Sequence, residues 1–118
     1  MLFLIIDDEQ FARNTLKRLL SGLDAEIIEA DNAYDGYTLV KEKFPDIVFC
    51  DIMMNEIGGD WLIEKLMDTI PQANIIVGSG QPKEKLLKYE LMGAKAIITK
   101  PIKYNLLMAE VDKIIERK

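Results

Sequence analysis

The sequence predicts an α/β domain of three layers, in which a parallel five-stranded sheet is covered by helices on both faces. Short apolar runs alternate with longer amphipathic stretches along the chain, five of each. Four of the five runs are apolar at consecutive positions, which is typical of strands that are buried on both faces. Strands of this kind that alternate with helices form parallel sheets through right-handed crossover connections. Because no linker or internal repeat interrupts the pattern, we expect one domain over residues 1–118.

The first two strand–helix units are predicted over residues 2–44. The apolar run 2–6 forms the first strand, and a weaker run over 26–29 forms the second. After each run, apolar residues recur at spacings of three and four, as on the buried face of a helix. Asn32 or Asp31 is a suitable N-cap for the second helix. The predicted buried stripes are Phe11, Thr15, Leu16, Leu19, Leu20 and Leu23 in the first helix and Ala33, Tyr37, Val40 and Phe44 in the second.

The other three units follow the same pattern. Their strands are predicted over 47–50, 75–77 and 96–98. Pro71 and Gly93 follow the third and fourth helices, where such residues act as stop signals. The predicted buried stripes are Ile63, Leu66, Met67 and Ile70 in the third helix, Leu86, Leu87 and Leu91 in the fourth, and Leu107, Val111, Ile114 and Ile115 in the fifth.

The composition excludes several classes of function. The chain has 118 residues, with 15 Lys plus Arg against 20 Asp plus Glu, and its net charge of −5 disfavours direct binding to nucleic acid. It has no His, which is the usual general base and the commonest zinc ligand. Its one Cys, Cys50, is predicted to be a buried structural thiol on the sheet face opposite to Asp51. The first apolar run is too short for a signal peptide or a membrane span, so we expect a cytoplasmic protein with no membrane partner.

Charged and polar side chains follow four of the predicted strands. Asp7 and Asp8 follow the first strand, Asp51 the third, Ser79 the fourth and Lys100 the fifth. Because the carboxyl ends of parallel strands meet at one edge of a sheet, we expect these side chains to lie together. Three adjacent carboxylates repel one another unless they share a cation, and Mg²⁺ prefers such oxygen ligands. Lys100 and Ser79 can bind the oxygens of a phosphoryl group. The set therefore predicts a phosphoryl-transfer site in which a carboxylate can be the acceptor.

These motifs, in this order, resemble those of the receiver domain of two-component response regulators, a family that includes chemotaxis regulators. The segments that carry the resemblance are Asp7-Asp8, Asp51-Ile52-Met53-Met54, Ser79-Gly80 and Lys100-Pro101. The resemblance extends over essentially the whole chain. It implies a flavodoxin-like (βα)5 fold with the strand order 2-1-3-4-5.

The resemblance also implies a function in phosphorelay signal transduction. Asp51 would be the phosphoacceptor, and the donor would be a phosphohistidine on a sensor histidine kinase or a phosphotransfer protein. Ser79 and Lys100 would contact the phosphoryl group, and the bond between Lys100 and Pro101 would be cis. The protein would then be a switch rather than an enzyme, with self-catalysed phosphotransfer and slow autodephosphorylation as its chemistry.

A Mg²⁺ cofactor is part of the same resemblance. Asp8, Asp51 and the main-chain carbonyl of Met53 would bind the ion directly, and Asp7 would act through a water. Two positions depart from the pattern of the family: Ile97 stands where a switch aromatic is common, and Asn55 stands where a proline is usual. Neither change removes a predicted ligand or the acceptor, so we expect phosphorylation to be retained while its readout differs.

The partner-binding face of receivers is commonly formed by the fourth helix, the fifth strand and the fifth helix. Residues 83–118 contain nine basic and five acidic side chains, a net charge of +4, whereas the rest of the chain carries −9. We therefore expect this face to bind an acidic downstream protein or a second copy of the chain. High salt, or neutralisation of Lys85 and Lys88, should weaken that association.

Two functional alternatives remain at this point. A receiver-like interaction module that acts without phosphorylation is compatible with Ile97. A phosphohydrolase with Asp51 as its nucleophile would need a second Asp two residues later, where this chain has Met53.

Asp7 and Asp8 also have a purely structural interpretation. Taken alone, they would be acids that stabilise the first turn of a helix. The absence of a linker after the last predicted helix is mildly in favour of a stand-alone regulator, but a receiver taken from a longer protein would have the same sequence, so both remain open.

Overall fold

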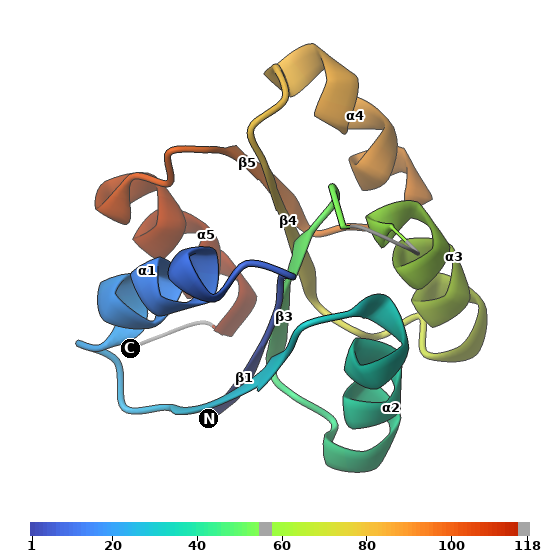
Figure 1. Ribbon diagram of the computed structural model, residues 1–118, viewed down its shortest axis with the longest axis horizontal. Coiled ribbons are helices and arrows are strands. Elements are labelled where there is room, and N and C mark those ends of the chain that lie inside the picture. The colour runs from blue at the N-terminus through green and yellow to red at the C-terminus, as the bar shows by residue number, and fades with distance from the viewer. Residues whose placement is uncertain (55–57, 116–118) are drawn as a thin grey trace.

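The computed structural model describes residues 1–54 and 58–115, in which five strands alternate with five helices (Figure 1). The strands are β1 (Leu2–Ile6), β2 (Glu26–Ala30), β3 (Ile47–Asp51), β4 (Ile75–Ser79) and β5 (Ala96–Thr99). The helices are α1 (Gln10–Leu20), α2 (Ala33–Lys43), α3 (Gly59–Thr69), α4 (Lys83–Met92) and α5 (Tyr104–Ile115). Each predicted strand and helix is therefore present, in the predicted order.

The strands form one parallel sheet in the predicted order, β2-β1-β3-β4-β5. β1, β3 and β4 lie inside the sheet and are almost entirely buried, which their continuous runs of branched and aromatic residues allow. β2 lies at an edge and is only partly buried, which explains its weaker apolar pattern. The register pairs Asp51 with Gly78 and Ser79 with Thr99, so the carboxyl ends of β3, β4 and β5 share one edge.

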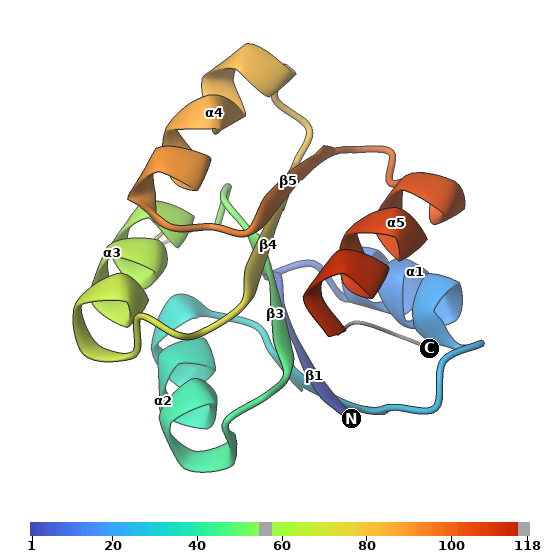
Figure 2. The same cartoon turned by 180° about the vertical axis from the view of Figure 1, so that it is seen from behind.

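Helices cover both faces of the sheet, which confirms the three predicted layers. α1 and α5 lie on one face, and α2, α3 and α4 lie on the other (Figures 1 and 2). Because successive residues of a strand point to opposite faces, β3 contributes Phe49 to the core under α1 and α5 and Cys50 to the core under the other three helices. Cys50 is buried, as predicted, and burial raises the pKa of its thiol.

Short sequence signals set the ends of three helices. Asn32, rather than Asp31, is the N-cap of α2, because its side-chain oxygen accepts a hydrogen bond from the main-chain N–H of Asp35 at 2.8 Å. α3 ends shortly before Pro71. Gly93 follows α4 with a φ of 126°, a conformation that residues with a side chain rarely adopt.

Four of the predicted core positions are wrong. Phe11 is 78% exposed and Leu91 is 91% exposed, and Phe44 and Leu87 are exposed as well. Phe11 precedes the buried Leu16 by five residues, which is about 1.4 helical turns, so the two side chains leave opposite sides of α1. Leu91 follows Leu86 by the same interval on α4, where Leu86 and Tyr89 form the buried face and Leu87 lies beside it. Phe44 lies past the end of α2 with a φ of 50°, so it does not continue the stripe of that helix.

Candidate functional site

The acidic cluster lies at the carboxyl edge of the sheet, at the ends of β1 and β3. Asp7 and Asp8 follow β1, and Asp51 is the last residue of β3. Each of these three residues has a carboxylate oxygen within 4.8 Å of those of the other two. Asp7 and Asp51 are buried, at 5% and 8% exposure, and Asp8 is half-buried. The fold therefore brings together three carboxylates that are spread over 45 positions of the sequence, as predicted.

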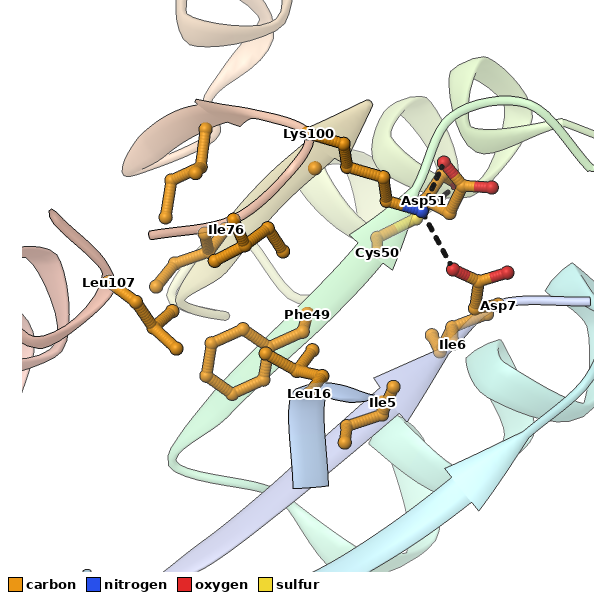
Figure 3. Close-up of a pocket in the computed structure, with 13 residues that line it drawn as sticks. Ile5, Ile6, Asp7, Leu16, Phe49, Cys50, Asp51, Ile76, Lys100 and Leu107 are labelled. Carbon is orange, nitrogen blue, oxygen red and sulfur yellow. Dashed lines mark hydrogen bonds and ion pairs between the residues drawn. The ribbon is translucent and has the colours of Figure 1, made fainter. Parts of the chain in front are cut away.

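Lys100 reaches this cluster from the end of β5. Its Nζ lies 3.1 Å from Oδ2 of Asp7 and 3.6 Å from Oδ1 of Asp51, and Figure 3 shows the ammonium between the two carboxylates. Burial lowers the pKa of Lys100, but the charges of Asp51 and Asp7 outweigh burial and raise it overall. The ammonium therefore stays charged and partly balances the carboxylates. The peptide bond between Lys100 and Pro101 is cis, as the resemblance implied.

The electrostatic environment of Asp51 raises the pKa of its carboxyl to about 6. Burial is the main cause, and the charges of Asp7 and Asp8 raise the pKa further. The charge of Lys100 and a hydrogen bond with the main chain of Met53 lower it in part. Asp51 is thus mostly ionised at pH 7, yet its charge is poorly compensated, and a cation at this place would stabilise it.

Ser79 is the last residue of β4, which is next to β3 in the sheet, and Met53 follows β3; the two residues differ in burial. Ser79 is fully buried at the end of β4, where its Oγ accepts a hydrogen bond from the main-chain N–H of Gln81 at 3.1 Å. Its carbonyl accepts a hydrogen bond from the N–H of Lys100 at 2.7 Å, so the ends of β4 and β5 are joined. Met53 has an exposed side chain, and its main chain contacts the carboxylate of Asp51. Asn55 lies outside the described residues.

Ile97 lies on β5, at the position that the family commonly gives to a switch aromatic. It is half-buried and packs against the core under α2, α3 and α4. An aliphatic side chain packed in this way cannot act by rotation of an aromatic ring.

One functional candidate is absent from the set predicted from the sequence. Arg13, on α1, donates a hydrogen bond from Nη1 to the main-chain carbonyl of Asp7 at 2.7 Å. The sequence shows an arginine six residues after Asp7 on an amphipathic helix, which is the usual pattern of a solvated helix face. Only the packing of α1 against the end of β1 places its guanidinium next to the acidic cluster.

A small cavity lies beneath the carboxylates, on the side of the sheet that α1 and α5 cover (Figure 3). Its volume is about 30 Å³, and its walls are mainly apolar, from residues such as Ile5, Phe49 and Leu107. Pockets that enclose organic cofactors are about tenfold larger or more. The cavity therefore accommodates small groups, and the chemistry of the site is set by the oxygens at its mouth.

The cluster fits a hard divalent cation. Its donors are carboxylate oxygens, which Mg²⁺ prefers, and Asp8 is accessible from solvent. Three carboxylates face one ammonium, that of Lys100, so the cluster has an excess of negative charge that a cation would offset. These residues could therefore hold a metal ion.

Comparison with known proteins identifies the family. The response regulator receiver domain family matches residues 3–112. The chain belongs to the response regulator receiver family. Chemotaxis protein CheY of Thermotoga maritima is 34% identical over 113 residues, which are 94% of each chain. Chemotaxis protein CheY of Bacillus subtilis is 30% identical over 114 residues, 95% of each. The structure of a CheY-like receiver domain protein from Methanospirillum hungatei superposes with a TM-score of 0.86 at 26% identity, covering 98% of this chain and 94% of that one.

Membership of the response regulator receiver family defines the general function of the chain. Receivers are phosphoacceptor switches of two-component signalling, they typically bind Mg²⁺, and CheY-like members interact with histidine kinases and downstream effectors. The phosphohydrolase and the phosphorylation-independent module are therefore not needed to explain the site. Among the described helices, none is long and apolar enough to cross a membrane.

Proposed function

We propose that residues 1–118 form a single receiver that accepts a phosphoryl group on Asp51 from a phosphohistidine of a sensor histidine kinase or a phosphotransfer protein. The observation that carries the proposal is the position of Asp51 at the end of the central strand β3, with Asp7 and Asp8 on one side and the ammonium of Lys100 at 3.6 Å. A cytoplasmic location accords with donors of this kind.

In the proposed step, a carboxylate oxygen of Asp51 attacks the phosphorus atom of the donor. A P–O bond forms as the P–N bond to the imidazole breaks, and the electron pair of that bond leaves with the donor nitrogen. Asp51 must be ionised to attack, and a pKa of about 6 leaves it mainly ionised at pH 7. Lys100 lies where it can move from the carboxylate to a phosphoryl oxygen, and we assign the hydroxyl of Ser79 to another oxygen of that group.

Mg²⁺ would neutralise the negative charge that gathers on the phosphoryl oxygens. We assign direct ligation to Asp8, Asp51 and the main-chain carbonyl of Met53, and a water-mediated role to Asp7. The burial of Asp7 and its ion pair with Lys100 at 3.1 Å support an indirect role for its carboxylate, since one oxygen is already occupied. The half-buried Asp8 is the more accessible of the two.

Incubation with Mg²⁺ and acetyl phosphate, followed by intact-mass measurement, tests the proposal. The wild type should gain a single phosphoryl group that is acid-stable and base-labile, as an acyl phosphate is. Asp51→Asn should gain none. The control is Asp24→Asn, which removes an exposed carboxylate between α1 and β2 and should leave the adduct unchanged. An undiminished adduct in Asp51→Asn, or rapid multiple-turnover hydrolysis of phosphate esters, contradicts the proposal.

We further propose that phosphorylation changes how the α4–β5–α5 face binds an acidic downstream protein or a second copy of the receiver. Exposed apolar side chains lie on this face, with Leu87 and Leu91 on α4 and Leu106 on α5, and they are interspersed with lysines. Apolar contacts would supply affinity there, and the lysines would supply orientation and salt sensitivity.

Sedimentation velocity of the phosphorylated receiver, at low and high salt, tests the self-association arm. Association should be salt-sensitive and should weaken when Lys85→Gln and Lys88→Gln are combined. The matched control combines Lys41→Gln with Lys43→Gln, which removes the same charge from α2 on another part of the surface. If the receiver does not self-associate, the acidic downstream protein is the remaining candidate partner. If the two double variants have equal effects, the basic charge of this face serves only solubility.

A further inference from the structure

Arg13 connects three parts of the structure beside the acidic cluster. Its side chain is only 11% exposed. Nη1 donates to the carbonyl of Asp7 at 2.7 Å, and Nε donates to Oε1 of Glu29 on β2 at 3.0 Å. Nη2 donates to Oε1 of Gln10, in the first turn of α1, at 3.1 Å. Three acceptors therefore fix the orientation of the planar guanidinium.

Asp7 is bonded through each of its polar groups. Its main-chain N–H donates to the carbonyl of Ala30 at 3.1 Å. Its Oδ1 accepts from the N–H of Glu9 at 3.0 Å, and its Oδ2 accepts from Lys100 at 3.1 Å. Arg13 donates the hydrogen bond to the main-chain carbonyl of Asp7. This carbonyl group forms the peptide bond to Asp8.

The carbonyl of Asp7 belongs to the peptide unit that it shares with the nitrogen of Asp8. Because that unit is planar, a group that holds the carbonyl also sets the direction in which the chain enters Asp8. The carboxylates of Asp7 and Asp8, which flank this peptide, both belong to the cluster, in which the ligand oxygens of Asp7, Asp8 and Asp51 lie within 4.8 Å of one another. The orientation of one peptide therefore controls whether both carboxylates face one ion.

We propose that Arg13 is a positioning residue for the cation, which it serves by fixing the peptide between Asp7 and Asp8. The proposal rests on the proposed binding of Mg²⁺ to this cluster. Arg13 touches neither the cation nor the phosphoryl group. It keeps the carboxylates of Asp7 and Asp8 in place before the ion binds, so that binding does not have to order the main chain between them.

Lys17 provides a matched comparison on the same helix. Its Nζ lies 3.0 Å from Oε2 of Glu29, the same distance at which Arg13 binds the other oxygen. The pKa of Glu29 is lowered by its hydrogen bonds to Lys17 and to Arg13, against the opposing effect of burial. When Arg13 is replaced, Lys17 still pairs with Glu29, so no unpaired carboxylate is created on β2.

Simple charge effects predict the opposite sign from positioning. Removal of a cation beside three carboxylates reduces its repulsion of Mg²⁺, so Coulomb interactions alone would make the ion bind more tightly. Loss of positioning makes the ion bind more weakly. The direction of the change in Kd therefore separates the two explanations.

The experiment is a titration of the full chain with Mg²⁺ alone, followed by the amide shifts in two-dimensional NMR spectra, which also show whether each variant is folded. Arg13→Met should raise the Kd for Mg²⁺ about tenfold, the usual scale for groups that orient metal ligands. Arg13→Lys keeps the charge but not the planar group that joins three acceptors, so its Kd should rise as well. Lys17→Met should leave the Kd within about twofold of wild type, because Lys17 does not hold the turn.

A kinetic measurement distinguishes positioning from general destabilisation. With acetyl phosphate as donor, Arg13→Met should need more Mg²⁺ for half-maximal phosphorylation, and its rate at saturating Mg²⁺ should return to within about threefold of wild type. An unchanged or lower Kd in both Arg13 variants overturns the proposal, and if Arg13→Met does not fold, Arg13→Lys alone decides. Failure of the proposed function looks different, because then the wild type itself would bind no Mg²⁺ or form no adduct at Asp51.

Discussion

Asp51 carries its charge in a place where burial disfavours it. Only 8% of the residue is exposed, two carboxylates lie nearby, and one ammonium at 3.6 Å offsets them in part. A carboxyl group with these neighbours binds a proton more readily in the folded protein than in the unfolded chain. Because folding raises this pKa to about 6, the free energy of unfolding depends on pH through the carboxyl of Asp51.

We expect Asp51→Asn to stabilise the metal-free fold at neutral pH. Because the pKa is raised by folding, the folded state binds more protons than the unfolded state between about pH 4 and pH 6. The stability of the wild type therefore falls as the pH rises through this window. The variant lacks this loss and should be more stable by about 1 to 3 kcal/mol above pH 7, and by little below pH 4.

Urea unfolding in EDTA, at a series of pH values from 4 to 8, measures this effect. The difference in the free energy of unfolding between variant and wild type should grow as the pH rises. Asp24→Asn, on the exposed segment between α1 and β2, should show no such trend. A difference that is constant with pH would show that the carboxyl of Asp51 has its ordinary pKa, and one that shrinks as pH rises would show that folding lowers its pKa; either result contradicts the expectation.

At the scale of elements, α3 and α4 are joined by a hydrogen bond between Tyr89 and Asp60. The hydroxyl of Tyr89 donates to Oδ1 of Asp60 at 2.6 Å, and Tyr89 is only 2% exposed. Burial, together with this hydrogen bond to a carboxylate, raises the pKa of the Tyr89 hydroxyl. Asp60 is in the first turn of α3, so the contact links the start of the helix after β3 with the helix of the proposed partner face.

We expect Tyr89→Phe to lower the free energy of unfolding by about 1 to 2 kcal/mol, since it removes the donor to a charged acceptor. Lys88→Gln is the matched control on the same acceptor. Its ammonium lies 3.6 Å from Oδ2 of Asp60, and both side chains are about 60% exposed, so the loss should stay below about 1 kcal/mol. Denaturant unfolding of both variants measures the comparison. Equal losses would show that the buried geometry of the Tyr89 bond adds nothing.

Gly59 permits the close approach of α3 to the end of β3. A side chain at this position would place its Cβ 2.9 Å from Cα of Ile52 and 3.1 Å from the carbonyl oxygen of Asp51. These are main-chain atoms, so the backbone beside Asp51, the proposed phosphoacceptor, must move to admit a methyl group. The glycine is thus required by packing at the site rather than by an unusual φ.

We expect Gly59→Ala to lower stability by about 1 to 3 kcal/mol, because it overpacks a tight contact. It should also weaken Mg²⁺ binding, since the displaced atoms adjoin Asp51. Gly22→Ala is the control: its Cβ meets no atom within 4 Å, and the change should be neutral or slightly stabilising. Thermal unfolding and an Mg²⁺ titration of both variants give the result. Wild-type affinity in Gly59→Ala would mean that the main chain at Asp51 and Ile52 moves without cost to the site.

For the whole molecule, the cluster stores repulsion that a bound cation would relieve. Mg²⁺ should therefore stabilise the fold by mass action, by about 1.4 kcal/mol at a concentration ten times its Kd. For a domain of this size the melting temperature should rise by about 3 to 6 °C. Scanning calorimetry with increasing Mg²⁺ measures the rise. Asp51→Asn should show a much smaller one, and an equal rise in both proteins would indicate that the ion binds elsewhere.

The class of fold and the place of the site follow from local features of the chain. Continuous apolar runs can be buried only in a sheet that is covered on both faces, and their alternation with amphipathic stretches leads to parallel strands. Parallel strands end at one edge, so Asp7, Asp51 and Lys100 lie at the same edge of the sheet, and the strand order brings them into contact there. Periodicity was a weaker guide on the helices, because apolar residues at five-residue intervals, such as Phe11 and Leu91, fall on the exposed side.

The tertiary structure decided the properties that depend on distance and burial. The pKa of Asp51 comes from the combined effects of burial, Asp7 and Lys100, which lie far from Asp51 in the sequence. The hydrogen bond from Arg13 to the carbonyl of Asp7 exists because α1 packs back against the end of the strand from which it emerges. The sequence by itself thus determined which groups lie at this edge of the sheet, through the direction of the strands. Only the packed structure decided how their charges balance and which side chains hold them in place, since both depend on contacts between residues that no local pattern relates.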